Sequence, residues 1–323
     1  MANPSVLNSS LLCDSERLQC LNDCIPHTSF SKSFIYSTMM YVCNFVLECT
    51  KDSSLDLVPD DDLLERLSIV VEMCSSSRHT VSYLLSSEFA AIHDFLLKAL
   101  APFNDPSKYV KEMTSKLLSI YCSATEYAEG SVTKSNFYEP LIELCLGSLI
   151  LMDPNIMESA FSILHHSAQN CTRHCSHIRH YFCGNENMPA IVDFVFKNSL
   201  RPAMLNNLWL LMESLLSSKD DPASDDEIQL YLPILFENIS QLITSIDSKN
   251  NPPTTAIISC TKIYICARTS RSETSSNALL QIRSQLKYAL EKIIMNFDAK
   301  RCQDDKSQME ECQLLYNELQ KQI

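Results

Sequence analysis

Apolar residues recur at helical spacing along nearly the whole chain. The stretch 136–152 shows the pattern most clearly, because a helix there is apolar on most of its sides. One predicted face carries Leu141, Leu144, Cys145 and Ser148, and the neighbouring face carries Ile142, Leu146, Leu149 and Ile150. Glu143 is the single charge after Pro140. A helix of this kind is expected to lie between layers, as an inner helix of a stack does.

The next helix is predicted to begin at Asp153-Pro154. Aspartate caps a helix N-terminus, and proline fits the first turn, where no intrahelical N–H bond is lost. An apolar stripe follows, formed by Ile156, Met157, Ala160, Phe161 and Leu164. The run DPNIMESAFSILHHSA resembles the second half of an armadillo or HEAT repeat, where Asp-Pro opens a helix with apolar residues at such offsets.

Prolines recur in front of apolar helical runs. They stand at Pro59, Pro106, Pro154, Pro202 and Pro253, so the spacings are 47, 48, 48 and 51 residues. A near-constant period in this range is typical of helical solenoids. An irregular helical bundle is the alternative, because 13 prolines offer many spacings.

The recurring prolines and the apolar runs together predict six helical pairs and one extra helix. The pairs are 30–50 with 59–74, 79–101 with 106–123, 136–152 with 154–169, 188–200 with 202–218, 228–247 with 253–268, and 275–297 with 304–320. A helix over 9–24 is expected to cap the first pair, since terminal repeats need polar covers. We therefore expect an all-α chain: one armadillo/HEAT-like α-solenoid over 1–323, with repeats over 30–320.

The composition agrees with helices and disfavours several function classes. Only 3 of 323 residues are glycine, far fewer than β-sandwiches, doubly wound sheets or phosphate-binding loops use. The net charge of -13 disfavours nucleic-acid binding. An acidic chain suits a protein or peptide partner with a basic segment, or is simply kept soluble by its charge.

The compartment is inferred from the cysteines and the apolar runs. The N-terminus has no basic segment followed by an apolar one, as a signal peptide would, and no run of about 18 apolar residues predicts a transmembrane helix. Most of the 15 cysteines lie in apolar helical runs, where they behave as small hydrophobic residues. We expect a cytoplasmic or nuclear protein with free thiols, away from membranes.

One dense cluster of potential metal ligands spans 165–183. It contains five of the eight histidines and three cysteines: His165, His166, His174, His177, His180, Cys171, Cys175 and Cys183. Zinc needs about four nitrogen or sulfur ligands, and Cys171 and Cys175 are one helical turn apart. His174 and His177 come within reach if the segment bends, yet the spacing matches no zinc-finger pattern. A repeat-end segment with core cysteines and surface histidines is the main interpretation, with a metal site or a redox or catalytic cysteine as alternatives.

Motifs for catalysis are missing from the sequence. There is no G-x-S-x-G, no H-E-x-x-H and no glycine-rich phosphate loop. We therefore expect a non-enzymatic chain without a cofactor. A metal- or thiol-dependent sensor or enzyme built on the 165–183 cluster stays open, as does a regulatory subunit of an enzyme complex.

Candidate partner contacts lie on the second helices of the predicted pairs, which line the concave face in armadillo and HEAT arrays according to the resemblance. In 201–216 these are Asn206, Asn207, Trp209 and Glu213, and His165 and His166 are further candidates. An exposed tryptophan beside asparagine anchors a peptide well. The repeated W-x-x-x-N pattern of importin-α-like arrays is missing, so Trp209 is also interpreted as core. The expected function is a protein-protein interaction scaffold or adaptor.

Overall fold

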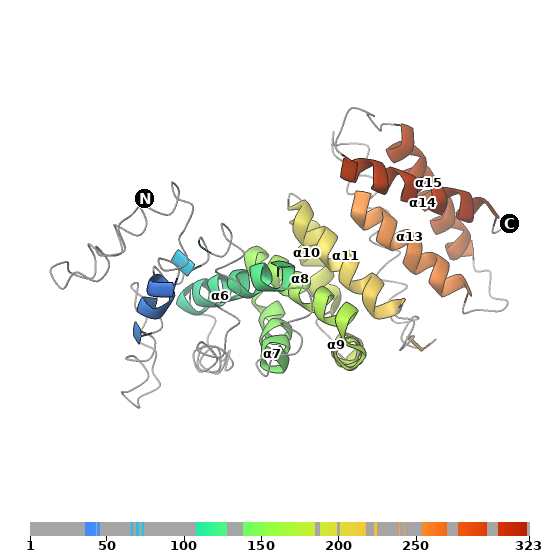
Figure 1. Ribbon diagram of the computed structural model, residues 1–323. Helices are drawn as coiled ribbons and strands as arrows, with labels where there is room; N and C mark the ends of the chain where they lie inside the picture. Colours follow the sequence, from blue (N-terminus) through green and yellow to red (C-terminus); the bar gives the residue numbers. More distant parts are fainter. Residues whose placement is uncertain are drawn as a thin grey trace. The chain divides into compact units, whose positions relative to one another are not determined.

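The computed structural model describes residues 36–42, 44–45, 66, 69–70, 73, 108–127, 138–184, 188–198, 201–217, 223–224, 239, 242, 254–269, 277–295 and 303–321. Every element of secondary structure formed by these residues is a helix, which confirms the all-α prediction. The helices are α6 (Lys108–Tyr127), α7 (Tyr138–Ser148), η4 (Leu149–Leu151), α8 (Pro154–Asn170), α9 (Thr172–Gly184), α10 (Met188–Lys197), α11 (Pro202–Leu216), α13 (Thr254–Thr269), α14 (Asn277–Met295) and α15 (Gln303–Lys321) (Figure 1).

The chain divides into two compact units, residues 1–163 and 164–323, and the boundary falls inside α8. The sequence analysis predicted a single array over 1–323. That prediction depends on how the two units join, and it stays a prediction.

In the first unit, α7 is buried on most sides, as its apolar pattern predicts. The buried positions are Leu141, Ile142, Leu144, Cys145, Leu146, Ser148 and Leu149, while Glu143 is exposed. Ile150 was expected to be covered, but 48% of it is exposed. The cause is local: the chain tightens from an α-helix to the 3-10 helix η4 at Leu149, and three residues per turn change the direction of the next side chains.

The turn between η4 and α8 is made by Met152 and Asp153. Met152 adopts the left-handed conformation with φ 49°, and its N–H donates to the oxygen of Leu149 at 3.3 Å. The Asp153 carboxylate then accepts the N–H groups of Asn155 and Ile156 at 2.9 and 3.2 Å. Asp153 is thus the N-cap and Pro154 the first residue of α8, as predicted.

The predicted role of proline as a helix opener is confirmed at a second place. Pro202 is the first residue of α11, although Arg201 before it provides no side-chain cap. Pro59, Pro106 and Pro253 lie outside the described residues, as does the predicted capping helix 9–24 and the helix expected over 79–101. Described positions within 30–50, 59–74 and 228–247 are all helical.

In the second unit, helices pack on near neighbours in the sequence. The most extensive pairing is α11 with α13, and α13 also packs on α14 and α15, which pack on each other (Figure 1). At the other end of the unit, α9 and α10 both pack on α11. The helices α9, α11, α13 and α15 therefore follow one another in contact, while α10 and α14 lie beside members of that series.

The predicted pairs 188–200 with 202–218 and 275–297 with 304–320 correspond to α10 with α11 and to α14 with α15. The helix α9 lies between two predicted pairs and was not predicted as an element. It contains most of the histidine- and cysteine-rich segment, so it is the element on which the candidate site depends.

Candidate functional site: helix α9 and its packing on α11

The side chains of α9 divide between two faces. The inner face is buried and consists of His174, Cys175, Ile178, Arg179 and Phe182. The outer face is exposed and consists of Thr172, Arg173, Ser176, His177 and His180. The predicted metal-ligand set is split by this division, because His174 and Cys175 point into the unit whereas His177 lies on the exposed side.

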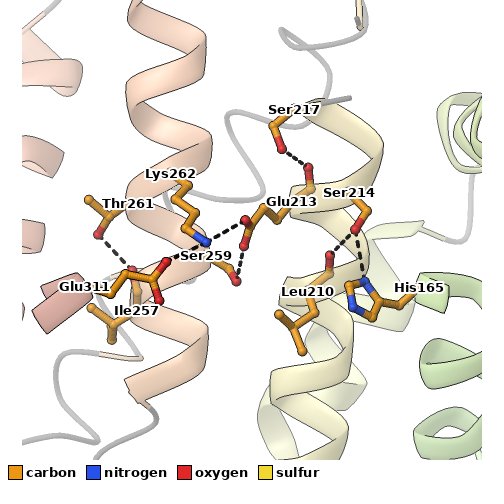
Figure 2. Close-up of polar contacts among 10 residues, drawn as sticks. All are labelled: His165, Leu210, Glu213, Ser214, Ser217, Ile257, Ser259, Thr261, Lys262 and Glu311. Carbon is orange, nitrogen blue, oxygen red and sulfur yellow. Dashed lines mark hydrogen bonds and ion pairs between the residues drawn. The ribbon is translucent and has the colours of Figure 1, made fainter. Parts of the chain in front are cut away.

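Two serine–histidine pairs connect α8, α9 and α11. His174 Nδ1 lies 3.1 Å from the hydroxyl of Ser167 on α8. His165, also on α8, has its Nδ1 3.0 Å from the hydroxyl of Ser214 on α11 (Figure 2). The Ser214 hydroxyl is also within 3.0 Å of the oxygen of Leu210, one turn earlier. These pairs satisfy polar groups at buried or half-buried helix contacts, which unpaired groups would destabilise.

The pKa of His165 is lowered from 6.5 to about 4. Burial is the main cause, because it disfavours the charged imidazolium, and the neighbouring His166 adds repulsion. A hydrogen bond with the Leu210 backbone opposes the shift in part. His165 is therefore neutral at physiological pH and serves as a hydrogen-bonding group between α8 and α11.

The C-terminal end of α11 is covered by donors from α9, from α13 and from Ser217, the residue after the helix. A helix leaves its last four carbonyl groups without intrahelical partners. The Ser217 N–H donates to Glu213 O at 2.9 Å, and the Cys175 thiol lies 3.7 Å from Ser214 O. Arg179 donates to Leu215 O at 3.0 Å, and the Cys266 thiol of α13 lies 3.8 Å from Leu216 O. All four carbonyls thus have a donor, and α9 supplies two of them.

Glu213 connects α11 with α13. Its carboxylate accepts the Ser259 hydroxyl at 2.6 Å and contacts the Lys262 ammonium at 2.9 Å. Lys262 also reaches Glu311 of α15 at 2.8 Å, so one lysine bridges two carboxylates from different helices (Figure 2). Burial lowers the pKa of Lys262, but hydrogen bonds and attraction from Glu311 and Glu213 outweigh it and raise the pKa overall.

The remaining predicted partner contacts on α11 are largely internal. Trp209 is 3% exposed and packs edge-on against Phe196 of α10, with ring centroids 6.5 Å apart. The interpretation of Trp209 as core is confirmed. Asn206 and Asn207 are half-buried, and both Asn206 Oδ1 and Trp209 Nε1 are buried atoms without a hydrogen-bond partner. His166 is half-buried as well, with its ring 5.4 Å from that of His165.

Within the part of the chain that the structure describes, no three His, Cys, Asp or Glu side chains come together in a way that could hold a metal ion. Cys171 and Cys175 instead frame the start of α9, where the Cys175 N–H donates to Cys171 O at 2.9 Å. The eight described cysteines are free thiols. Burial raises the pKa of the thiols of Cys145, Cys260 and Cys266, and that of Cys312 to about 12. A protonated thiol is a poor nucleophile, so these four positions do not suit thiol catalysis.

Comparisons of the chain with protein-family models, with curated proteins and with solved structures gave no match. Among the described helices, none combines the length and apolar character needed to cross a membrane.

Proposed function

We propose that this chain is a non-enzymatic scaffold or adaptor that binds a protein partner through the surface of an armadillo/HEAT-like helical array. One observation carries the proposal: α9, α11, α13 and α15 contact one another in succession, with α10 and α14 beside them. Stacked helical hairpins make contacts of this kind, because each repeat touches only its neighbours. The link from such a fold to binding is an analogy at the level of fold.

The use of the reactive side chains supports the same proposal. His165, His174 and Cys175 each contact a group on a neighbouring helix, and so does Glu213. Groups that hold helices together are poorly placed to receive a substrate. The outward faces of the helices then remain as the surface for a partner, and the free thiols support a cytoplasmic or nuclear location.

The test is purification of the full chain from its own cells after mild cross-linking, followed by reconstitution with each protein recovered. We expect a complex of fixed stoichiometry in size-exclusion chromatography with light scattering, formed from the two purified components. Failure of every recovered protein to reassociate, together with a turnover activity of the isolated chain, would contradict the proposal. Elemental analysis of the same preparation separates the metal-dependent alternative, which requires close to one equivalent of bound metal.

A further inference from the structure

A short acidic stretch follows α11 in the sequence: residues 217–227 are SSKDDPASDDE. Within it, Ser224 is followed directly by Asp225, Asp226 and Glu227. No other serine or threonine of the chain has acidic residues at all three of the following positions. Protein kinases select substrates partly by the charges around the acceptor hydroxyl, and acidophilic kinases bind carboxylates that follow it, above all at the third position. Ser224 therefore has the sequence context of an acceptor for an acidophilic kinase.

Three other serines in the described part of the chain share some of this context, because each has an acidic residue at the third following position. They are Ser123, Ser217 and Ser307. Ser123 is half-buried on α6, and its hydroxyl donates to Ser119 O at 3.1 Å. Ser217 is half-buried at the end of α11, where its hydroxyl donates to Glu213 O. Ser307 is exposed but lies within the helix α15.

The structure separates Ser224 from these three serines. Its side chain is exposed, and both Ala223 and Ser224 have a non-helical backbone, a combination that none of the other three has. Phosphoryl transfer requires the acceptor oxygen to lie in line with the γ-phosphorus and beside a catalytic carboxylate. A serine within a helix reaches that position only when its turn opens, and opening has a free-energy cost. An exposed hydroxyl outside a helix exchanges its hydrogen bonds for those of the kinase at small net cost.

The three acidic residues after Ser224 are close enough to guide this reaction. When residues 224–227 lie extended across a kinase, each residue adds about 3.3 Å, so the third carboxylate is about 10 Å along the chain from the acceptor. That distance is comparable to the Debye length at physiological ionic strength. Basic side chains of the kinase near its transfer site therefore attract all three carboxylates and hold the acceptor hydroxyl in place.

We propose that Ser224 is a phosphorylation site for an acidophilic serine/threonine kinase that uses Mg–ATP. The Ser224 hydroxyl oxygen forms a bond to the γ-phosphorus as the bond from that phosphorus to the β,γ-bridging oxygen breaks, and ADP leaves. The hydroxyl proton passes to a carboxylate of the kinase and then to solvent. The product carries about 1.5 to 2 additional negative charges at this position near pH 7. This inference does not depend on the proposed scaffold function.

The experiment incubates the purified full chain with Mg–ATP and a recombinant kinase that selects serines followed by acidic residues. Intact-mass measurement counts the phosphoryl groups, and peptide mass spectrometry locates them. We expect about one group per chain, located at Ser224, and almost none in Ser224→Ala. The matched control is Ser307→Ala, which removes an exposed serine that also has an acidic third neighbour, and it should leave the incorporation unchanged.

A second comparison tests the acidic residues. D226N/E227Q should lower kcat/KM of the kinase for the chain about tenfold or more, because two charge-assisted contacts are lost. E310Q/E318Q removes the same formal charge from exposed positions of α15 and should change kcat/KM less than about twofold. Circular dichroism establishes that the variants fold like the wild-type chain.

The third arm examines the chain purified from its own cells with phosphatase inhibitors present, in which peptides containing phosphorylated Ser224 should be found. Incorporation at Ser217 or Ser307 in place of Ser224, equal kcat/KM for the two charge variants, or a Ser224 that is entirely unmodified in the chain from cells would each overturn the inference. None of these results would affect the scaffold proposal, which is tested by reconstitution with a partner.

Discussion

The guanidinium of Arg179 donates a hydrogen bond to the backbone oxygen of Leu215, 3.0 Å away and 36 residues further along the chain. Arg179 is 4% exposed, so a buried cation lies at the C-terminal end of α11, where the helix dipole places partial negative charge. A similar contact occurs at the other end of the second unit, where Arg283 of α14 donates to Leu319 O near the end of α15. In both cases an arginine of one helix donates to a carbonyl near the C-terminal end of another helix.

Replacement of Arg179 by methionine should lower the free energy of unfolding by about 2 kcal/mol, because Leu215 O loses a charged donor while remaining buried. Urea unfolding followed by circular dichroism measures the change. The control is Arg173→Met, an exposed arginine on the same helix, for which we expect less than about 0.5 kcal/mol. Similar losses for the two variants would show that Arg179 does not stabilise the end of α11.

The bridge from Glu213 through Lys262 to Glu311 predicts unequal effects for the two carboxylates. Glu213→Gln weakens contacts to both Ser259 and Lys262, whereas Glu311→Gln weakens only the contact to Lys262. The Glu213 side chain is 19% exposed and that of Glu311 39%, so solvent screens the outer pair more strongly. We expect a loss of about 1 to 2 kcal/mol for Glu213→Gln and below about 0.5 kcal/mol for Glu311→Gln.

A double-mutant cycle with Lys262→Met tests the same bridge. The coupling of Lys262 to Glu213 should exceed its coupling to Glu311, and both should shrink at high salt. Couplings of equal size in urea unfolding experiments would mean that the bridge acts only as a surface ion pair on both sides.

Local chemistry made some elements of this fold predictable. Asp153 and Pro154 define the start of α8 by themselves, since the cap and the first turn need only adjacent residues. The apolar residues on most sides of α7 likewise predicted its burial from local sequence alone. That prediction was wrong only at Ile150, where the α-helix changes to a 3-10 helix. Trp209 was interpreted as core because the repeated W-x-x-x-N pattern of importin-α-like arrays is missing from the sequence.

The site on α9 could not be derived in the same way. Its inner face contains a short apolar series, Cys175, Ile178 and Phe182, but the polar residues His174 and Arg179 are buried beside it, so the apolar pattern is narrow. The groups that make these polar residues favourable inside are Ser167, Ser214 O and Leu215 O, and the last two lie more than thirty residues away. The sequence places metal-ligand types at suitable spacing, whereas the contacts that assign their role are set by tertiary packing. The solenoid and the capping helix 9–24 stay predictions.

The left-handed backbone at Met152 predicts that an asparagine there is tolerated better than a valine. A φ of 49° is disfavoured for residues with a Cβ and most strongly for β-branched ones. Met152→Val should cost about 1 kcal/mol or more in thermal unfolding, while Met152→Asn should be nearly neutral. Ile150→Val, an exposed neighbour two residues earlier, is the control and should change stability by less than about 0.5 kcal/mol. Tolerance of valine at both positions would contradict the turn geometry.

The lowered pKa of His165 predicts a specific dependence of stability on pH. Its folded-state pKa is about 4, below the 6.5 of an unperturbed histidine. Between these values the unfolded chain binds a proton that the folded chain does not, so the free energy of unfolding falls as pH decreases from about 6.5 to about 4. Above that window both states are neutral, and below it both are protonated, so the loss occurs only within it. From pH 7 to pH 5 it should amount to at most about 2 kcal/mol.

His165→Gln isolates this contribution, because glutamine can still hydrogen-bond the Ser214 hydroxyl but does not titrate. Other ionisable groups contribute alike to the wild-type chain and the variant, so their shared pH dependence cancels in the difference between them. Urea unfolding at both pH values should show that acidification lowers the free energy of unfolding less in His165→Gln than in the wild-type chain. A difference that stays constant with pH would mean that His165 is protonated without cost in the folded chain, and that the contact between α8 and α11 does not depend on its neutral form.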